Sequence, residues 1–296
     1  MTGPALRFGL FLSQASKSLA QVQDEFGMAE ELGFDTAYLV DHLVDTDGPP
    51  DRPCLESWTL LAGLATMTSR IRLGVLVTSN TFRHPALLLK SAVTVDHLSG
   101  GRLILGLGTG WHEDEHRRYG IPLPSPSERV DRLEEALEVI TRLMAAETTT
   151  YEGRHYQLHD AYLEPRPVQR PRIPILVAAH RPRMLRIAAR YADQWDTFVE
   201  LPGTATEGVT SDLAARVAAF DAACLAVGRD PANIRRSTWA GRDVWRSAAS
   251  YLDFVRRHRS IGFTDIAAVL PEPADLPVLR QVAADVIPAL RAGWSV

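Results

Sequence analysis

Residues 100–115 read GGRLILGLGTGWHEDE, an apolar run between glycines that is followed by an aromatic residue, a histidine and acidic residues. The run at 103–107 predicts a buried strand, because a short continuous apolar stretch bounded by glycine is typical of a strand covered on both faces. Gly106, Gly108 and Gly110 alternate through the end of this strand, so phosphate oxygens could approach the backbone amides there without meeting a Cβ atom. The alternative is that these small residues only let the strand end pack under a loop.

Seven further short apolar segments alternate with stretches of helical periodicity, which is the pattern of repeated βα units. The eight expected strands are 7–12, 36–40, 71–77, 103–107, 175–178, 194–198, 234–240 and 265–269. Eight such units in 296 residues favour a closed barrel over an open doubly wound sheet, since barrels of this kind have typically ~250 residues. We therefore expect an α/β fold in which 1–296 form one (β/α)8 TIM barrel domain.

Two stretches interrupt the alternation and are expected to be insertions after the fourth and sixth strands. Residues 149–174 are β-prone and then proline-rich, which predicts a hairpin and an extended crossing segment outside the barrel. Residues 199–212 are polar with two glycines, which predicts a long loop. Ahead of both stretches, Ser125, Pro126 and Glu128 predict a capped helix start.

Composition excludes several classes of protein. The chain is 46% hydrophobic with a net charge of -4 and has no basic run, which argues against nucleic acid as a partner. Its two cysteines cannot form a disulfide framework or a metal knuckle, which fits a reducing cytoplasm. No apolar run approaches the roughly 20 residues that span a bilayer. We expect a soluble, cytoplasmic protein that acts on a small molecule.

The carboxyl ends of barrel strands meet at one mouth, where barrel enzymes carry their chemistry. The residues expected there are Asp41, His42, 78–83, 108–115, 178–183 and 195–196. His42 directly follows an apolar strand and could donate a proton or bind a cofactor, although a histidine there could also be only a satisfied polar group. Asp96 and His97 precede a strand, so we expect them at the opposite face of the barrel.

Residues 112–116, HEDEH, match the order of the zinc motif His-Glu-x-x-His. That motif requires the middle of an apolar helix, whereas this stretch is expected to open a loop after the glycine-rich strand end. We therefore expect no metal site. Further along the chain, a helix is expected to begin near Pro182, where its free N–H groups and Arg181 would favour an anion.

Three separated stretches carry a family resemblance: AEELGFDTAYLVDHL at 29–43, LVTSNTFRHPALLLKSAVTVDHLSGGRLILGLGTGW at 76–111 and PILVAAHRPRMLRIAARYADQW at 174–195. In this order and at these strand ends, they closely resemble the bacterial-luciferase-like superfamily of flavin- and coenzyme F420-dependent oxidoreductases, the luciferase-like monooxygenase family. The resemblance implies a barrel whose mouth holds FMN or coenzyme F420. It also implies a homodimer that forms through the helices beside the second and third strands, where 56–67 are apolar beyond a single stripe.

The resemblance assigns roles to individual positions. It places His42 near the reactive face of the cofactor ring and a non-proline cis peptide bond between Leu76 and Val77 behind the ring. Further cofactor contacts are implied at Asp41, Ser79, Gly108, Thr109, Gly110, Ala178 and Ala179, with Ser79 at the polar edge of the ring and the last five near the phosphate or ribityl chain. Many members have two glycines where this chain has His180 and Arg181, which could narrow the phosphate pocket or add cationic contacts.

The resemblance favours a coenzyme F420-dependent oxidoreductase that transfers a hydride between C5 of the deazaflavin and a small organic substrate. His42 would protonate or orient the substrate, Trp111 and Trp195 would line the pocket, and Glu113 would close the loop. Trp111 occupies the position of a glutamate in the sugar-phosphate dehydrogenase branch, which favours an apolar or aromatic substrate instead. The alternatives are an FMN-dependent monooxygenase and a flavin-binding protein without catalytic activity.

Overall fold

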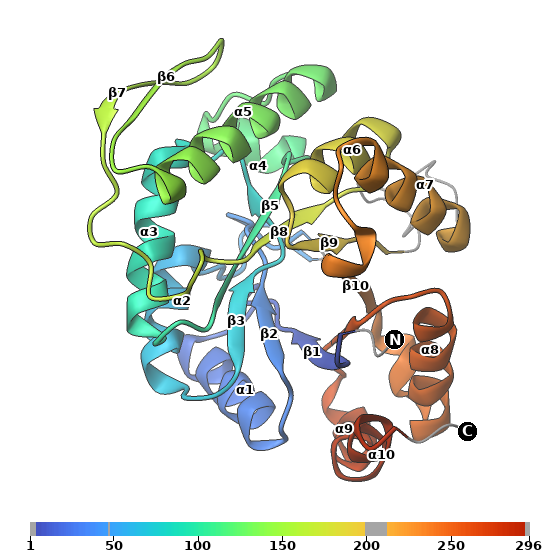
Figure 1. Cartoon of the computed structure of the whole chain (residues 1–296). Coiled ribbons are helices and arrows are strands. Elements are labelled where there is room, and N and C mark those ends of the chain that lie inside the picture. Colours follow the sequence, from blue (N-terminus) through green and yellow to red (C-terminus); the bar gives the residue numbers. More distant parts are fainter. Residues whose placement is uncertain (1–3, 47, 199–211, 294–296) are drawn as a thin grey trace.

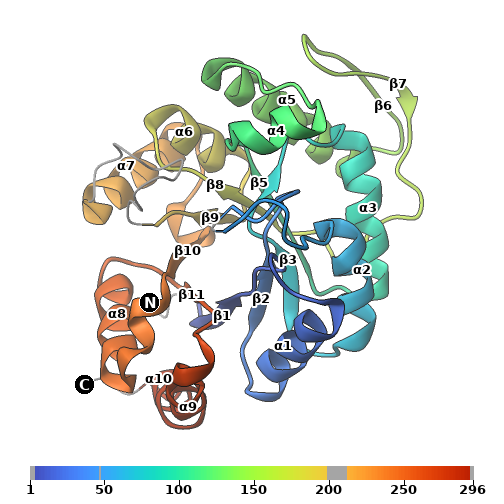
Figure 2. The same ribbon diagram turned by 180° about the vertical axis from the view of Figure 1, so that it is seen from behind.

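The computed structural model describes residues 4–46, 48–198 and 212–293, and Figures 1 and 2 show strands enclosed by helices. The strands of the barrel are β1 (Arg7–Phe11), β2 (Thr36–Leu39), β3 (Arg72–Val75), β4 (Thr78–Ser79), β5 (Leu103–Gly108), β8 (Ile175–Ala178), β9 (Gln194–Asp196), β10 (Arg235–Ala240) and β11 (Asp265–Val269). Their order is β3-β2-β1-β11-β10-β9-β8-β5-β4, every pair is parallel, and a β3–β5 pairing closes the barrel. The predicted (β/α)8 barrel is confirmed.

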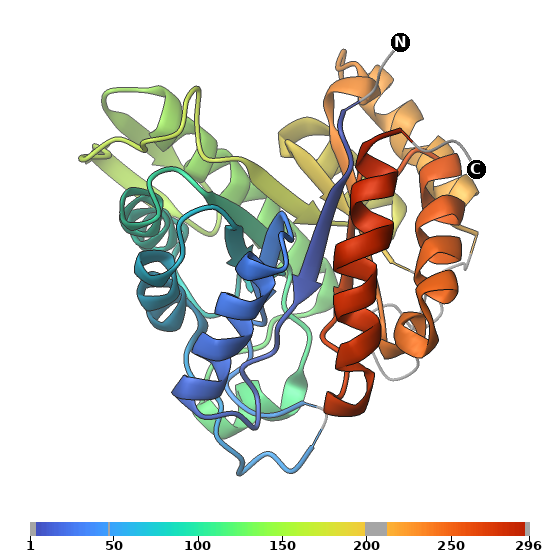
Figure 3. The same cartoon turned by 90° about the horizontal axis from the view of Figure 1, so that it is seen from below.

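The helices form the outer layer. They are α1 (Leu19–Glu31), α2 (Ser57–Met67), α3 (Pro85–Leu98), α4 (Glu113–Tyr119), α5 (Pro126–Ala145), α6 (Pro182–Tyr191), α7 (Leu213–Ala226), α8 (Ala248–Ser260), α9 (Leu276–Gln281) and α10 (Ile287–Arg291). The short 3₁₀ helices η1 (Pro231–Asn233), η2 (Arg242–Arg246) and η3 (Pro273–Asp275) accompany them, and a π-helical segment, η4 (Val282–Val286), joins α9 to α10. Figure 3 shows the C-terminal helical segment running beside β1. Among the described residues, no helix is both long enough and apolar enough to cross a membrane.

All eight expected strands are confirmed, and their ends differ from the prediction by a few residues. The largest difference is in the third, expected at 71–77, which the structure divides into β3 and β4 at a cis peptide bond between Leu76 and Val77. Gly33 and Gly262 follow the ends of α1 and α8, and both have the positive φ angles, 79° and 96°, that glycine adopts readily after a helix.

The main core lies between the barrel and the helices. Side chains alternate along each strand, so Phe8 and Leu10 of β1 face the helices and are fully buried. The opposite face of the strands fills the barrel interior, where Tyr38, Ile104 and Leu176 form a separate small cluster. Among the strand residues, therefore, only side chains that face the barrel interior can reach the mouth.

The first insertion is an antiparallel hairpin, β6 (Thr149–Glu152) and β7 (Gln157–Ala161), which lies outside the barrel as predicted (Figure 1). The crossing segment that follows is held at the amino ends of the strands by buried Asp96, which accepts hydrogen bonds from the Val168 and Gln169 N–H groups. Asp96 therefore has the structural position expected for it. The predicted loop at 199–212 lies outside the described residues except for Asp212, which caps α7.

Ser125 accepts a hydrogen bond from the Glu128 N–H and Pro126 is the first residue of α5, as predicted. The Glu128 carboxylate pairs with Arg132 one turn later. The helix start is thus confirmed.

Candidate active site

His42, at the carboxyl end of β2, is joined to the first turn of α4 by a hydrogen bond. Its Nδ1 lies 3.0 Å from Oε1 of Glu115, whose Oε2 accepts the Leu43 N–H at 2.9 Å. Burial alone raises the pKa of Glu115, but the hydrogen bonds from His42 and Leu43 outweigh it and lower the pKa below its usual value. An ionised carboxylate only accepts hydrogen bonds, so the proton lies on Nδ1 and Nε2 of His42 is left for a ligand.

Aromatic side chains surround this imidazole. The His42 ring makes edge contacts with Trp111 and His112, at centroid distances of 5.7 and 6.0 Å. His112 also caps α4, because its Nδ1 accepts the Glu115 N–H at 3.3 Å. The cap sets where the helix begins and so directs Glu115 toward His42.

The prediction that 112–116 open a loop is wrong, because α4 begins at Glu113. The two histidines of this segment nevertheless have different partners: His112 caps the helix, whereas Nε2 of His116 lies 2.7 Å from the Thr81 hydroxyl. In the part of the chain that the structure describes, no three metal-ligating side chains gather at one point.

The structure places the predicted residue Glu113 on the exposed side of α4, and the carboxylate that contacts His42 belongs to Glu115. Sequence reasoning missed Glu115 because it assigned no helix here. The available signal was His112 followed three residues later by Glu115, which is the spacing of a capping residue and the first helical turn.

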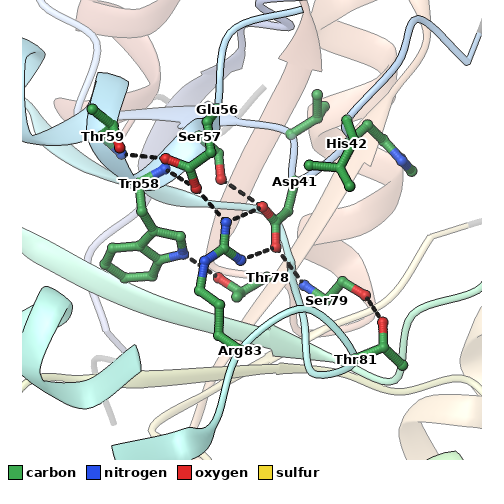
Figure 4. Close-up of polar contacts among 12 residues, drawn as sticks. Asp41, His42, Glu56, Ser57, Trp58, Thr59, Thr78, Ser79, Thr81 and Arg83 are labelled. Carbon is green, nitrogen blue, oxygen red and sulfur yellow. Dashed lines mark hydrogen bonds and ion pairs between the residues drawn. The ribbon is translucent and has the colours of Figure 1, made fainter. Parts of the chain in front are cut away.

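Asp41, next to His42, is buried and its carboxylate is occupied by protein donors (Figure 4). It accepts two hydrogen bonds from Arg83, at 2.7 and 3.0 Å, one from the Ser57 hydroxyl at 2.5 Å and one from the Ser79 N–H at 2.8 Å. Arg83 also pairs with Glu56. This network favours a positioning role for Asp41, because it holds Ser79 and the end of β4 rather than leaving an oxygen for a ligand.

The cis peptide bond between Leu76 and Val77 confirms what the family resemblance implied. The close approach of Val75 and Val77 explains the glycines of β5. A Cβ atom added at Gly106 would collide with the Val75 carbonyl oxygen, and one at Gly108 would collide with the Val77 side chain. The packing interpretation therefore accounts for these two glycines.

Gly110 and Thr109 continue this strand end into the mouth. Gly110 has a φ of 76°, and a Cβ atom on it would meet the Ser79 hydroxyl. Thr109 is half-buried beside it. Ser79 itself is buried and its Oγ lies 2.7 Å from the Thr81 hydroxyl. The strand ends of β4 and β5 thus meet closely.

The next strand end, after β8, combines Ala178, Ala179, His180 and Arg181. Ala178 is half-buried, whereas the Ala179 N–H donates to the Asp196 carbonyl at 3.0 Å and is already paired. Burial, together with the neighbouring arginine charges, lowers the pKa of His180 to about 3, so this imidazole is neutral. The predicted helix start at Pro182 is confirmed, and Arg181 provides no side-chain cap for the first N–H groups of α6.

Trp195 does not line the mouth, so that prediction is wrong. It is fully buried on the helix side of β9, where it stacks on Phe220 at 4.2 Å and donates a hydrogen bond to the Ala179 carbonyl. The physical reason is strand alternation: Gln194 and Asp196 occupy the inward positions on either side of it.

Sequence reasoning missed an aromatic floor at the mouth, formed by Phe11, Phe198 and Trp239. The rings of Phe11 and Trp239 are stacked at 5.2 Å with an angle of 8°, and Phe198 lies 4.4 Å from Trp239. All three are half-buried. The signal was alternation, since Phe11 and Trp239 occupy the inward positions after Gly9 and Ser237.

Comparisons with known proteins agree with this architecture. Residues 6–268 match the family model of the luciferase-like monooxygenases. An F420-dependent glucose-6-phosphate dehydrogenase from Microbacterium testaceum is 37% identical over 200 residues, which are 67% of this chain and 57% of that protein. The chain therefore spans a little over half the length of this curated relative.

Solved structures share the fold over almost the whole chain. An F420-dependent secondary alcohol dehydrogenase in complex with an F420-acetone adduct has a TM-score of 0.79 and 17% identity, covering 94% of this chain and 98% of that one. A coenzyme F420-dependent tetrahydromethanopterin reductase from Methanopyrus kandleri has a TM-score of 0.79 and 19% identity, covering 96% of this chain and 99% of that one. At such identities the likeness shows the common fold.

Proposed function

Because this chain belongs to the luciferase-like monooxygenase family, we propose that it is a coenzyme F420-dependent oxidoreductase. When bound, F420 would supply a hydride carrier at C5 of its ring for exchange with a small organic substrate; FMN is the alternative cofactor. The names of the relatives support F420. The observation that carries the proposal is the His42–Glu115 hydrogen bond, which orients an imidazole at the mouth for proton transfer.

The residues at the mouth fit a flat ring with a phosphate-bearing tail. Leu76 and Val77 form a half-buried apolar layer at the top of the barrel interior, which suits one face of such a ring. Ser79, Thr109 and Gly110 would lie along its polar edge. Ala178, Arg181 and the uncapped first turn of α6 would hold the phosphate, since a helix N-terminus favours an anion.

His42 is the residue to which we assign proton transfer. Its Nδ1–H is held by Glu115, so Nε2 would give a proton to, or take one from, the oxygen of a carbonyl or alcohol substrate. Trp111 would exclude water on one side of the imidazole, because its ring edge contacts His42. We assign neither Glu113 nor Trp195 to this step.

The aromatic floor supports a flat, uncharged substrate. Phe11 and Trp239 present parallel rings, and the neighbouring His180 makes an edge contact with Phe198 at 4.8 Å while remaining neutral. Rings of this kind bind planar apolar groups by stacking. Glucose 6-phosphate, named for the curated relatives, is a charged and strongly hydrated molecule, so we do not assign it to this chain.

The proposal is tested by titrating the purified protein with F420 and with FMN, each oxidised and reduced, while the cofactor spectrum is followed. We expect F420 to bind and to be reduced or reoxidised when ring-containing alcohols or ketones are added. Tight binding of FMN without any response to F420 would refute the F420 assignment. Binding of F420 without turnover of any acceptor would instead support a non-catalytic binding protein.

We also propose that two copies of the chain associate through the surface around α2. The expectation rests on family resemblance and on the apolar content of α2, whose last residue Met67 is 55% exposed. A light-scattering mass of two chains is expected, and a mass of one chain would contradict it.

A further inference from the structure

A second polar cluster lies deep inside the barrel, below the apolar layer of the mouth. Tyr38, Asp196, Ser237 and Asp265 come from four strands and line a buried cavity with about 10 Å³ of space for the centre of a water molecule. One water needs roughly 10–15 Å³ measured in this way. Leu76, which belongs to the apolar layer of the mouth, also lines this cavity.

Several polar atoms around the cavity have no hydrogen-bond partner in the described part of the chain. They include the Tyr38 hydroxyl and Oδ1 of Asp265, on residues that are 3% and 5% exposed. Arg7 lies 3.9 Å from this Oδ1, which is too far for a direct hydrogen bond. Buried polar groups are nearly always paired, and a single water commonly makes about three such bonds.

Ser237 lies beside Asp196 in this chamber. Its hydroxyl donates a hydrogen bond to Oδ1 of Asp196 at 2.7 Å and lies 3.3 Å from the Trp195 carbonyl oxygen. The single proton of Ser237 is therefore already used.

The charges around the chamber are unevenly distributed between its two carboxyl groups. Burial raises the pKa of Asp196 to about 7, against the hydrogen bond with Ser237, and the charge of Asp265 adds to the increase. The nearby cations belong to Asp265 instead: Arg235 bonds its Oδ2 at 2.7 Å, and Arg7 faces its Oδ1. Burial also raises the pKa of Tyr38, so its hydroxyl remains a neutral donor.

We propose that the barrel interior binds one ordered water molecule between Tyr38 and Asp265. The water accepts from the Tyr38 hydroxyl and donates to Oδ1 of Asp265, which pairs both orphaned atoms. This inference does not depend on the proposed enzymatic function, because none of these side chains is assigned to the reaction.

A crystal structure of the unliganded wild-type protein at high resolution tests the water. We expect one density peak within hydrogen-bonding distance of Tyr38 Oη and Asp265 Oδ1. A dry cavity would overturn the proposal. So would a peak with the short oxygen distances and higher coordination of a metal cation, because the chamber would then hold an ion and not a water molecule.

Discussion

Nδ1 of His42 lies 3.0 Å from a Glu115 carboxylate oxygen, which links the end of β2 to the start of α4. The two residues are 73 positions apart, and Glu115 is 2% exposed whereas His42 is 17% exposed. The carboxylate thus lies behind the imidazole, and the imidazole is the group that a ligand can reach. A proton-transfer residue must be accessible to the substrate, and its positioning partner must be held behind it, so this arrangement suits both roles.

Replacing Glu115 by Gln removes the ionised acceptor that fixes the His42 tautomer. We expect kcat to fall by about tenfold or more, and His42→Gln to cost roughly 10²-fold, within the range for general acid–base catalysis. The dissociation constant of F420 should change little in either variant. Steady-state kinetics and fluorescence titration measure the two quantities separately.

Glu113→Gln is the matched comparison, since Glu113 is exposed on the same helix turn. We expect wild-type kinetics from this variant. If it lost as much activity as Glu115→Gln, the assignment of roles within α4 would be incorrect.

Arg83→Met should destabilise the fold. The change leaves buried Asp41 without its cation, and breaking a buried pair in this way costs about 3–5 kcal/mol. Urea denaturation measures the loss. Arg256→Met, which removes an exposed ion pair with Asp253, is the control and should cost less than about 1 kcal/mol. Equal losses would mean that the Asp41 network contributes no more than a surface pair.

Asp196 and His180 should give opposite pH dependences of stability. The folded protein holds a proton on Asp196 up to about pH 7, whereas the ordinary pKa of an aspartate is 3.8. The contribution of Asp196 to the free energy of unfolding therefore falls as the pH rises between these two values. His180 stays neutral down to about pH 3 in the folded protein, whereas the same imidazole is protonated below about pH 6.5 in the unfolded chain. The contribution of His180 to the free energy of unfolding therefore rises with pH over that range. The two effects oppose each other between about pH 4 and 6.5.

Single variants separate these contributions. Relative to wild type, Asp196→Asn should become progressively more stable from pH 4 to 7, and His180→Gln should become progressively less stable from pH 3 to 6.5. Denaturation at several pH values measures both differences. If the free energy of unfolding of Asp196→Asn differed from that of the wild type by the same amount at every pH, this carboxyl group would titrate alike in the folded and the unfolded chain.

Trp239→Leu tests the aromatic floor. Because a stacked aromatic pair contributes about 0.5–1.5 kcal/mol, we expect kcat/KM for ring-containing acceptors to fall roughly two- to tenfold. The same variant should keep its kcat/KM for small aliphatic acceptors. Proportional losses for both classes would indicate a general structural defect instead of substrate recognition.

Periodicity alone predicted the barrel well, and the site only in part. Each strand repeats a local apolar pattern that is readable in one sequence, but Glu115 contacts His42 through a helix start that depends on one capping histidine. Trp195 was misplaced because the face of a strand cannot be read until its register is known. The cis bond at Leu76 and Val77 came from family resemblance, because no local pattern at these residues predicts it.

The central claim is that F420 binds at the mouth with its reacting ring carbon beside His42. A crystal structure of the protein with F420 tests it most directly. We predict the ring against Leu76 and Val77, Nε2 of His42 facing the substrate side, and the phosphate at the start of α6. A ring bound elsewhere, or with His42 out of reach of its reactive face, would contradict the account.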